Sequence, residues 1–138
     1  MAISTAIRTL LHDNATIHGI FVHRIYPGVA PMEVVLPCII YDIGDIQPTQ
    51  TASTDVGFDR VVVTVSVVDT TYSDVETYAQ NVRTALDGYS GTTDSELIEK
   101  ILYEGQEPNF DPDFTYSEAT TGVGAHTRTV TFTLIRKG

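Results

Sequence analysis

The sequence predicts an α+β fold: a mainly antiparallel four-stranded sheet, with two main helices packed on one face and long loops between the elements. Three observations predict it. Two segments carry apolar residues at helical spacing, four segments have the character of strands, and the strands follow one another in pairs with a helix between the pairs. A chain of 138 residues has the length of one domain, so we expect a single domain over residues 1–138.

The first predicted helix covers residues 3–14. Its apolar residues recur at helical spacing and form one stripe: Ile3, Ile7, Leu10 and Leu11. Asp13-Asn14 and then Gly19 favour turns, because of their short polar side chains and backbone freedom. We therefore expect the helix to end there.

The stretch from Arg24 to Pro37 is predicted to be an extended, semi-rigid arm. It contains a turn at Pro27-Gly28, and its prolines hold the backbone φ at about −65° while disfavouring helix in the residue before each. Such an arm loses little entropy when it is ordered against a neighbouring molecule. A simple crossover that returns the first helix to the sheet explains the same prolines.

The apolar run after the arm, residues 38–44, is predicted to be a strand with Ile39, Tyr41 and Ile43 on one face. The polar stretch 47–57 is predicted to be a long hairpin loop.

Two further segments alternate clearly between apolar and polar residues, as strands do. In residues 58–70 one face carries the valines Val61, Val63, Val65 and Val67. In residues 126–137 one face carries Val130, Phe132 and Leu134, and the other carries threonines. The threonine side predicts a sheet with one partly wet face.

The second helix is predicted over residues 72–88, between these strands. One face carries its apolar residues Val75, Ala79, Val82 and Leu86. Ser73 and Glu76 have the spacing of a capping box, and Gly88 lies where a left-handed C-terminal cap is expected.

The segment 96–105 fits neither period cleanly. We predict a strand, because the segment is short and ends in an aromatic residue and a glycine. The stretch 105–126 is then predicted to be a long loop. This stretch and the stretch 47–57 are both too long for simple connections in a compact domain. We expect them either to face partner proteins or to be disordered without a function.

The charge is strongly acidic, with a formal net charge of −10. Residues 94–118 hold eight acidic side chains against Lys100 alone, a net of −7. No basic patch is available for phosphates, so specific nucleic-acid binding is not expected. No apolar run has the length of a membrane span, so no membrane partner is expected either.

The histidines and the cysteine predict no metal site and no nucleophile. The histidines His12, His18, His23 and His126 match no zinc-ligand spacing, and Cys38 is the only cysteine. Its place in an apolar run predicts a buried, inert thiol.

No other pattern predicts chemistry. Asp111-Pro112-Asp113 lacks the glycine and the distal glutamate of a calcium-binding loop. The stretch from Gly122 to His126 lacks the rest of a phosphate-binding fingerprint. We therefore predict a protein that is not an enzyme and has no cofactor.

The layout and several local patterns resemble the tail-completion, or tail-terminator, proteins of long-tailed bacteriophages. The passages "RIYP…LPCIIYDIGD" and "VVVTVSVVDTTYSDVETYAQNVRTAL" carry the resemblance, together with the first helix and the last strand. The matching residues are Arg24, Tyr26, Pro27, Pro37, Tyr72, Val82, Arg83, Ala85 and Leu86. Cys38 departs from the pattern, since an aromatic residue is common there in the family.

The resemblance implies a virion structural protein that is made in the host bacterial cytoplasm and located in the neck region of the tail. Such proteins form a ring, here expected to have six subunits, at the end of the tail tube nearest the capsid. The ring stops tube polymerisation and joins the tail to the head, and DNA passes through its lumen. The implied partners are further copies of the chain, the tail-tube protein and the head-completion or neck protein.

The resemblance and the two long stretches together predict a set of residues at the subunit and partner interfaces. They are Arg24, Tyr26, Pro27, Pro31, Gln47, Pro48, Asp55, Phe110, Asp111, Asp113 and Phe114. If acids of the stretch 94–118 face the lumen, they repel DNA phosphates; if they face outward, they serve solubility.

Two other functions remain open from the sequence. One is a different neck or tail-tube component, and the other is a small ligand-binding module or an enzyme on the same layers. A deep pocket with convergent polar groups would favour the latter.

Overall fold

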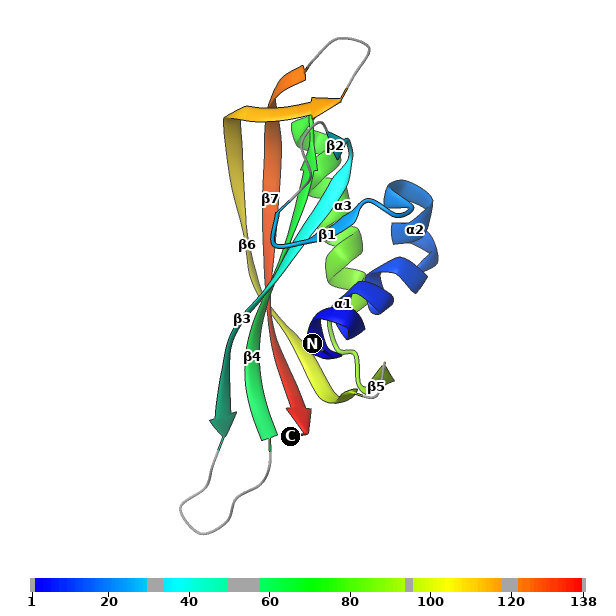
Figure 1. Ribbon diagram of the computed structural model, residues 1–138, viewed down its shortest axis with the longest axis vertical. Coiled ribbons are helices and arrows are strands. Elements are labelled where there is room, and N and C mark those ends of the chain that lie inside the picture. Colours follow the sequence, from blue (N-terminus) through cyan, green and yellow to red (C-terminus); the bar gives the residue numbers. More distant parts are fainter. Residues whose placement is uncertain (1, 30–33, 50–57, 94–95, 118–121, 138) are drawn as a thin grey trace.

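The computed structural model of the protein describes residues 2–29, 34–49, 58–93, 96–117 and 122–137 (Figure 1). The helices are α1 (Ala2–Asp13), α2 (Ala15–Phe21) and α3 (Tyr72–Leu86). The strands are β1 (Ile25–Pro27), β2 (Val34–Val35), β3 (Cys38–Thr49), β4 (Phe58–Asp69), β5 (Gly91–Thr93), β6 (Glu96–Ser117) and β7 (Gly122–Lys137).

The strands form one sheet in the order β1-β3-β4-β7-β6-β2, with β5 paired to β6. The pairs β3–β4, β4–β7 and β7–β6 are antiparallel, whereas β1 and β2 pair in parallel with β3 and β6. The α+β class is therefore confirmed. The expected four-stranded sheet is only its centre, since the described residues make seven strands.

All three helices lie on one side of the sheet, and the other side carries no helix (Figure 1). This agrees with the predicted packing on one face, with α2 as a helix that the sequence did not predict. No helix of the described residues is long and apolar enough to cross a membrane.

The main core lies between the sheet and the helices, and the alternation of the strands builds it. The four predicted valines of β4 and the three predicted apolar residues of β7 are all fully buried. They meet the buried stripe of α1 and that of α3, which consists of Val75, Ala79, Val82 and Leu86. Each such buried side chain stabilises the fold by about 1.5–3 kcal/mol relative to an exposed one.

A second, smaller apolar cluster lies apart from this core. Its buried members are Val34, Cys38, Val68, Tyr116 and Ala125. Cys38 and Val68 are directly opposite each other in the β3–β4 pair, and they alternate with Ile39 and Val67 of the main core. The cluster therefore lies on the helix-free face, where β2 and the end of β6 cover it.

The helix α2 corrects the expectation of a turn after Asn14. The Oδ1 atom of Asn14 accepts hydrogen bonds from the backbone N–H groups of Thr16 and Ile17, at 3.1 Å each. The residue that favours a turn after α1 therefore also caps the next helix. Gly19 lies inside α2, which packs against α1 and α3 with Ile17 and Phe21 buried.

The predicted loop 105–126 is largely strand, and the described part of the predicted loop 47–57 belongs to a strand as well. The strand β3 continues through Thr49, so that residues 47–49 pair with β4, while residues 50–57 lie outside the described residues. In the stretch 105–126, β6 continues to Ser117 and β7 begins at Gly122. Pro108 and Pro112 lie within β6, since a strand at the edge of a sheet accommodates proline.

The start of α3 differs from the predicted capping box. The N-cap residue is Thr71, no side chain accepts a capping hydrogen bond there, and Ser73 lies within the first turn. Gly88 follows the helix with a φ of +80°, as the predicted left-handed cap requires.

The predicted arm is attached to the sheet rather than extended away from it. Its strand β1 pairs with residues 39–41 of β3. The guanidinium of Arg24 donates from Nε to the Pro37 carbonyl at 2.8 Å and from Nη2 to the Ile20 carbonyl at 2.9 Å. Arg24 thus ties the end of α2 to the start of β3.

Replacing Arg24 by alanine is expected to lower the free energy of unfolding by about 1.5–3 kcal/mol, since two hydrogen bonds from a charged group are lost. Urea denaturation followed by far-UV circular dichroism measures the loss. The matched control is Arg8→Ala, because Arg8 is an exposed arginine of α1. An equal loss of unfolding free energy in the two variants would contradict this structural role of Arg24.

Candidate interaction surfaces

The predicted interface residues fall into separate regions of the sheet. Tyr26 and Phe114 both pack against the second apolar cluster, which brings the arm and the end of β6 together. Gln47 and Pro48 lie in the last part of β3, paired with β4. Pro31 and Asp55 lie outside the described residues. The fold thus brings Tyr26 and Phe114 to one cluster and places Gln47 and Pro48 in a different part of the sheet.

The remaining predicted residues have different surroundings. Arg24 makes the internal hydrogen bonds described above, and Pro27 is exposed at the end of β1. Asp111 and Asp113 lie in β6, next to a register shift between Asp111 and Thr115.

An aromatic group lies beside the outer part of the β6–β7 hairpin. The ring centroid of Phe110 is 4.9 Å from that of His126, which is 5.6 Å from that of Tyr72 at the start of α3. Phe110 is 51% exposed and Tyr72 46% exposed. These two large side chains therefore offer apolar surface close together.

One edge of the sheet is open along half of β3. The strand β1 pairs only with residues 39–41, so that in the described part of the chain no strand borders residues 42–49 on that side. The backbone of an edge strand offers N–H and C=O groups to a further strand. We call residues 42–49 the β3 edge.

The opposite edge of the sheet is open along the middle of β6. The strand β5 and the turn at Gly88-Tyr89 border β6 up to about Tyr103, and β2 borders it from Tyr116. Between them, no strand of the described residues borders residues 104–115 on the side away from β7. We call residues 104–115 the β6 edge.

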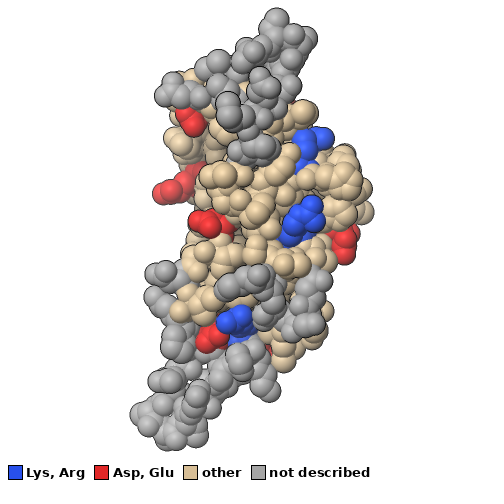
Figure 2. All heavy atoms as spheres, viewed as in Figure 1, with Lys and Arg blue, Asp and Glu red and all other residues tan. Residues whose placement is uncertain are grey.

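Both edges carry exposed carboxylates. Asp42 lies on the β3 edge, and Glu104 and Glu107 lie on the β6 edge. Figure 2 shows acidic side chains along the side of the molecule that β6 forms. Proline within a strand pattern, as at Pro108, is typical of an edge strand and is the sequence signal for the β6 edge.

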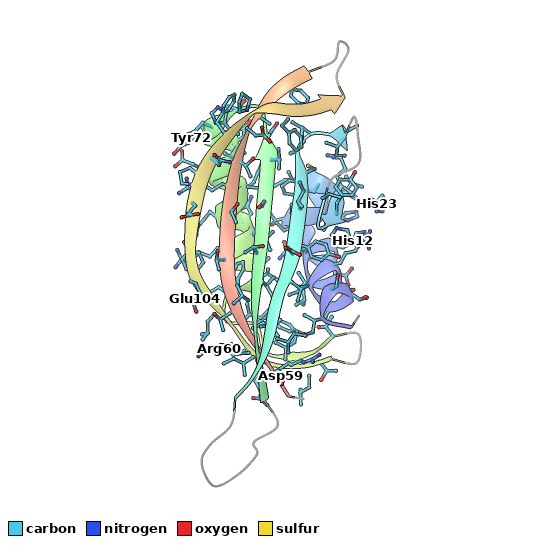
Figure 3. All side chains as sticks on the ribbon, turned by 60° about the vertical axis from the view of Figure 1, so that its left-hand side comes forward. His12, His23, Asp59, Arg60, Tyr72 and Glu104 are labelled. Carbon is cyan, nitrogen blue, oxygen red and sulfur yellow. The ribbon has the colours of Figure 1, made fainter. Side chains whose placement is uncertain are left out.

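The helix-free face between the edges is rich in hydroxyl groups (Figure 3). Paired residues of β4 and β7 face this side: Ser66 with Thr129, Thr64 with Thr131, and Val62 with Thr133. The hydroxyls of Ser66 and Thr129 are 2.9 Å apart and hydrogen-bonded. Five of these six residues carry a hydroxyl group, and we call the six together the hydroxyl face.

A small pocket of about 240 Å³ lies beside the β3 edge. It is lined by Ser4, Pro27, Gly28 and residues 41–44 and 46. Pockets that hold small organic ligands usually have about 300–1,000 Å³ and several convergent polar groups. The pocket therefore gives little support to the alternative of a ligand-binding module.

Cys38 is a buried thiol, as predicted. Burial raises its pKa from 9.0 to about 12, although the nearby Arg24 acts in the opposite direction. The thiol is therefore protonated near neutral pH and is a poor nucleophile.

Three of the four histidines come together, which their sequence spacing did not predict. His12 at the end of α1, His18 in α2 and His23 after α2 have ring centroids 4.8–6.0 Å apart. Around them, the described residues contain no group of three histidine, cysteine or carboxylate side chains arranged to hold a metal ion.

Comparison with known proteins gave one family and a related fold. Residues 5–120 match a family described as "Tail completion protein gp17". A solved chain from "Virion of native gene transfer agent (GTA) particle" superimposes with a TM-score of 0.66, covering 98% of this chain and 95% of that chain. Its sequence is 14% identical, so this likeness shows the fold alone. No curated protein matches significantly.

Proposed function

We propose that this chain, which belongs to the tail completion protein gp17 family, forms a ring that caps the tail tube of a phage virion. Family membership makes it a structural protein of the virion tail. In the proposal, the ring stops tube polymerisation and joins the tail to the head-side neck, and DNA passes through the lumen. We take six subunits, the number that the resemblance implies.

The observation that carries the ring is the pair of open edges at opposite ends of one sheet. The β3 edge of one subunit can pair with the β6 edge of the next, which adds main-chain hydrogen bonds between subunits. Because β3 and β6 run antiparallel to each other within the subunit, the new pair is antiparallel as well. The alternation of strand directions then continues from subunit to subunit.

An interface between two different surfaces of the same chain is heterologous, and it generates a closed ring when the rotation between subunits closes. Closure also removes the sheet edges, which are otherwise sites of aggregation. Both consequences favour a ring over a pair of subunits.

In this proposal, the position of the helices determines which face of the sheet lines the lumen. A closed sheet has more room outside than inside, and the helices form a bulky layer on one face only (Figure 1). The hydroxyl face then points inward. The serine and threonine side chains of this face carry no positive charge, and Arg60 is an exposed cation beyond Val62 on the same face of β4. DNA phosphates therefore meet mostly neutral side chains along the hydroxyl face.

The mass of the assembly tests the proposal. We expect light scattering over a concentration series, with negative-stain imaging, to show closed rings of about six subunits, alone or after purified tail tubes are added. Capped tubes should not lengthen when free tube protein is supplied. A chain that stays monomeric and neither binds tail tubes nor limits their growth would overturn the proposal.

The same images separate the terminator from another tube component. A tube component stacks end to end into long tubes in which it is the repeating subunit. A terminator stays as a single ring at one end. Stacked tubes built of this chain would favour the alternative.

A further inference from the structure

The histidines His12 and His23 have the geometry of a two-histidine chelate. Their nitrogens Nε2 and Nδ1 are 3.3 Å apart. Two nitrogens bound to one zinc ion at 2.0–2.1 Å, at a tetrahedral angle, are also about 3.3 Å apart. Figure 3 shows the two side chains next to each other on the helix side of the molecule.

The spacing of the two imidazole rings fits as well. Their centroids are 5.3 Å apart. Imidazoles that share one tetrahedral ion through these nitrogens have centroids about 5 Å apart. In the proposal, rotation of the side chains directs both lone pairs at one ion.

Asp13 lies beside the other ring nitrogen of His12. Its Oδ1 atom is 3.3 Å from Nδ1 of His12, which carries the proton when it donates to the carboxylate. The lone pair of His12 then lies on Nε2, which faces His23. A carboxylate that holds the second nitrogen in this way is the usual partner of a metal-binding histidine.

We propose that His12 and His23 bind one divalent transition-metal ion of the zinc, nickel or copper class, with Asp13 orienting His12. Water completes the coordination, since the described residues provide no group of three ligands at one point. The ion joins the end of α1 to the turn after α2. In its absence, the same 3.3 Å contact is a hydrogen bond between the two rings.

His18 borders the pair without being a ligand in this proposal. Its ring is nearly perpendicular to those of His12 and His23, at 80° and 83°. Its Nδ1 atom is buried, and none of the residues that the structure describes forms a hydrogen bond with it. This arrangement fits a packing neighbour, and it makes His18 an informative variant.

The test is titration of the purified, untagged protein with Zn²⁺, Ni²⁺ and Cu²⁺, followed by isothermal calorimetry and by thermal unfolding. We expect one ion per chain, an increased melting temperature, and the tightest binding for Cu²⁺.

The variants His12→Asn and His23→Asn should each lower the affinity more than about tenfold, and Asp13→Asn should lower it less, because Asp13 only orients a ligand. His126→Asn is the matched control, since His126 lies on β7 beside Phe110, and it should bind as the wild type does. Circular dichroism without metal checks that each variant folds.

Three results would overturn the site: no saturable binding to the wild type, unchanged binding in both His12→Asn and His23→Asn, or loss of binding in His126→Asn. Loss in His18→Asn with full binding in His23→Asn would overturn the assigned pair. The outcome does not depend on whether the chain forms a ring.

Discussion

Replacing Phe132 by alanine is expected to lower the free energy of unfolding by about 3–5 kcal/mol. Phe132 is fully buried in β7, where it is paired with Val63 on one side and Tyr103 on the other. Its ring lies edge-on to Tyr103, with centroids 6.1 Å apart. The truncation removes apolar contact with both neighbours and leaves a cavity where the central strands meet the helices.

The matched control is Phe110→Ala, because Phe110 is 51% exposed. It should change the free energy of unfolding by less than about 1 kcal/mol. Urea denaturation followed by circular dichroism measures both. Since natural domains are stable by only about 5–15 kcal/mol, the Phe132 variant should unfold at much lower urea concentration. Equal midpoints for the two variants would contradict the described core.

Assembly is expected to respond to the charge of the two sheet edges. In the proposed interface, the edge that carries Asp42 meets the edge that carries Glu104 and Glu107, and like charges on neighbouring strands are destabilising. Added salt should therefore promote ring formation. The ring fraction should rise as the ionic strength increases from about 0.01 M to about 1 M, where the Debye length falls from about 30 Å to about 3 Å.

Charge reversal on one edge should have a larger effect than salt. Asp42→Lys replaces repulsion between the two acidic edges by attraction, worth about 0.2–1 kcal/mol per interface, which is up to about fivefold in each association constant. The effect multiplies around a closed ring. Combining Asp42→Lys with Glu104→Lys and Glu107→Lys restores repulsion, so the triple variant should assemble less readily than Asp42→Lys alone.

The matched control is Glu76→Lys, which changes an exposed carboxylate of α3 by the same amount of charge. Sedimentation velocity and light scattering give the fraction of assembled chain. If Glu76→Lys promotes assembly as strongly as Asp42→Lys, the net charge of the chain controls assembly, and the charges on the sheet edges have no specific effect. If the Asp42→Lys variant and the triple variant show the same assembled fraction, the proposal that the two edges pair is wrong.

The two helices and the central strands could be predicted because local sequence decides which side chains share a face. In β4 the alternation of valines with polar residues has the period of a strand, and the valines are the buried ones. In α3 the stripe from Val75 to Leu86 follows the helical period, and it too is buried. The resemblance to the family rested on the same segments, and the family match confirms it.

Other features could not be predicted, because they depend on partners distant in the sequence. The strand β6 continues to Ser117 despite its prolines, since β7 pairs with it along most of its length. The capping-box expectation was wrong for a local reason: the N-cap of α3 is Thr71, two residues before Ser73.

The sequence by itself determined the fold class, the buried faces of the long strands, and the family. Only the tertiary structure decided which strand edges stay open and that His12 meets His23. Side-chain periodicity is a property of neighbouring residues and can be read along the chain. Strand order and the approach of α1 to the turn after α2 result from packing between segments far apart, where many pairings satisfy the same local pattern.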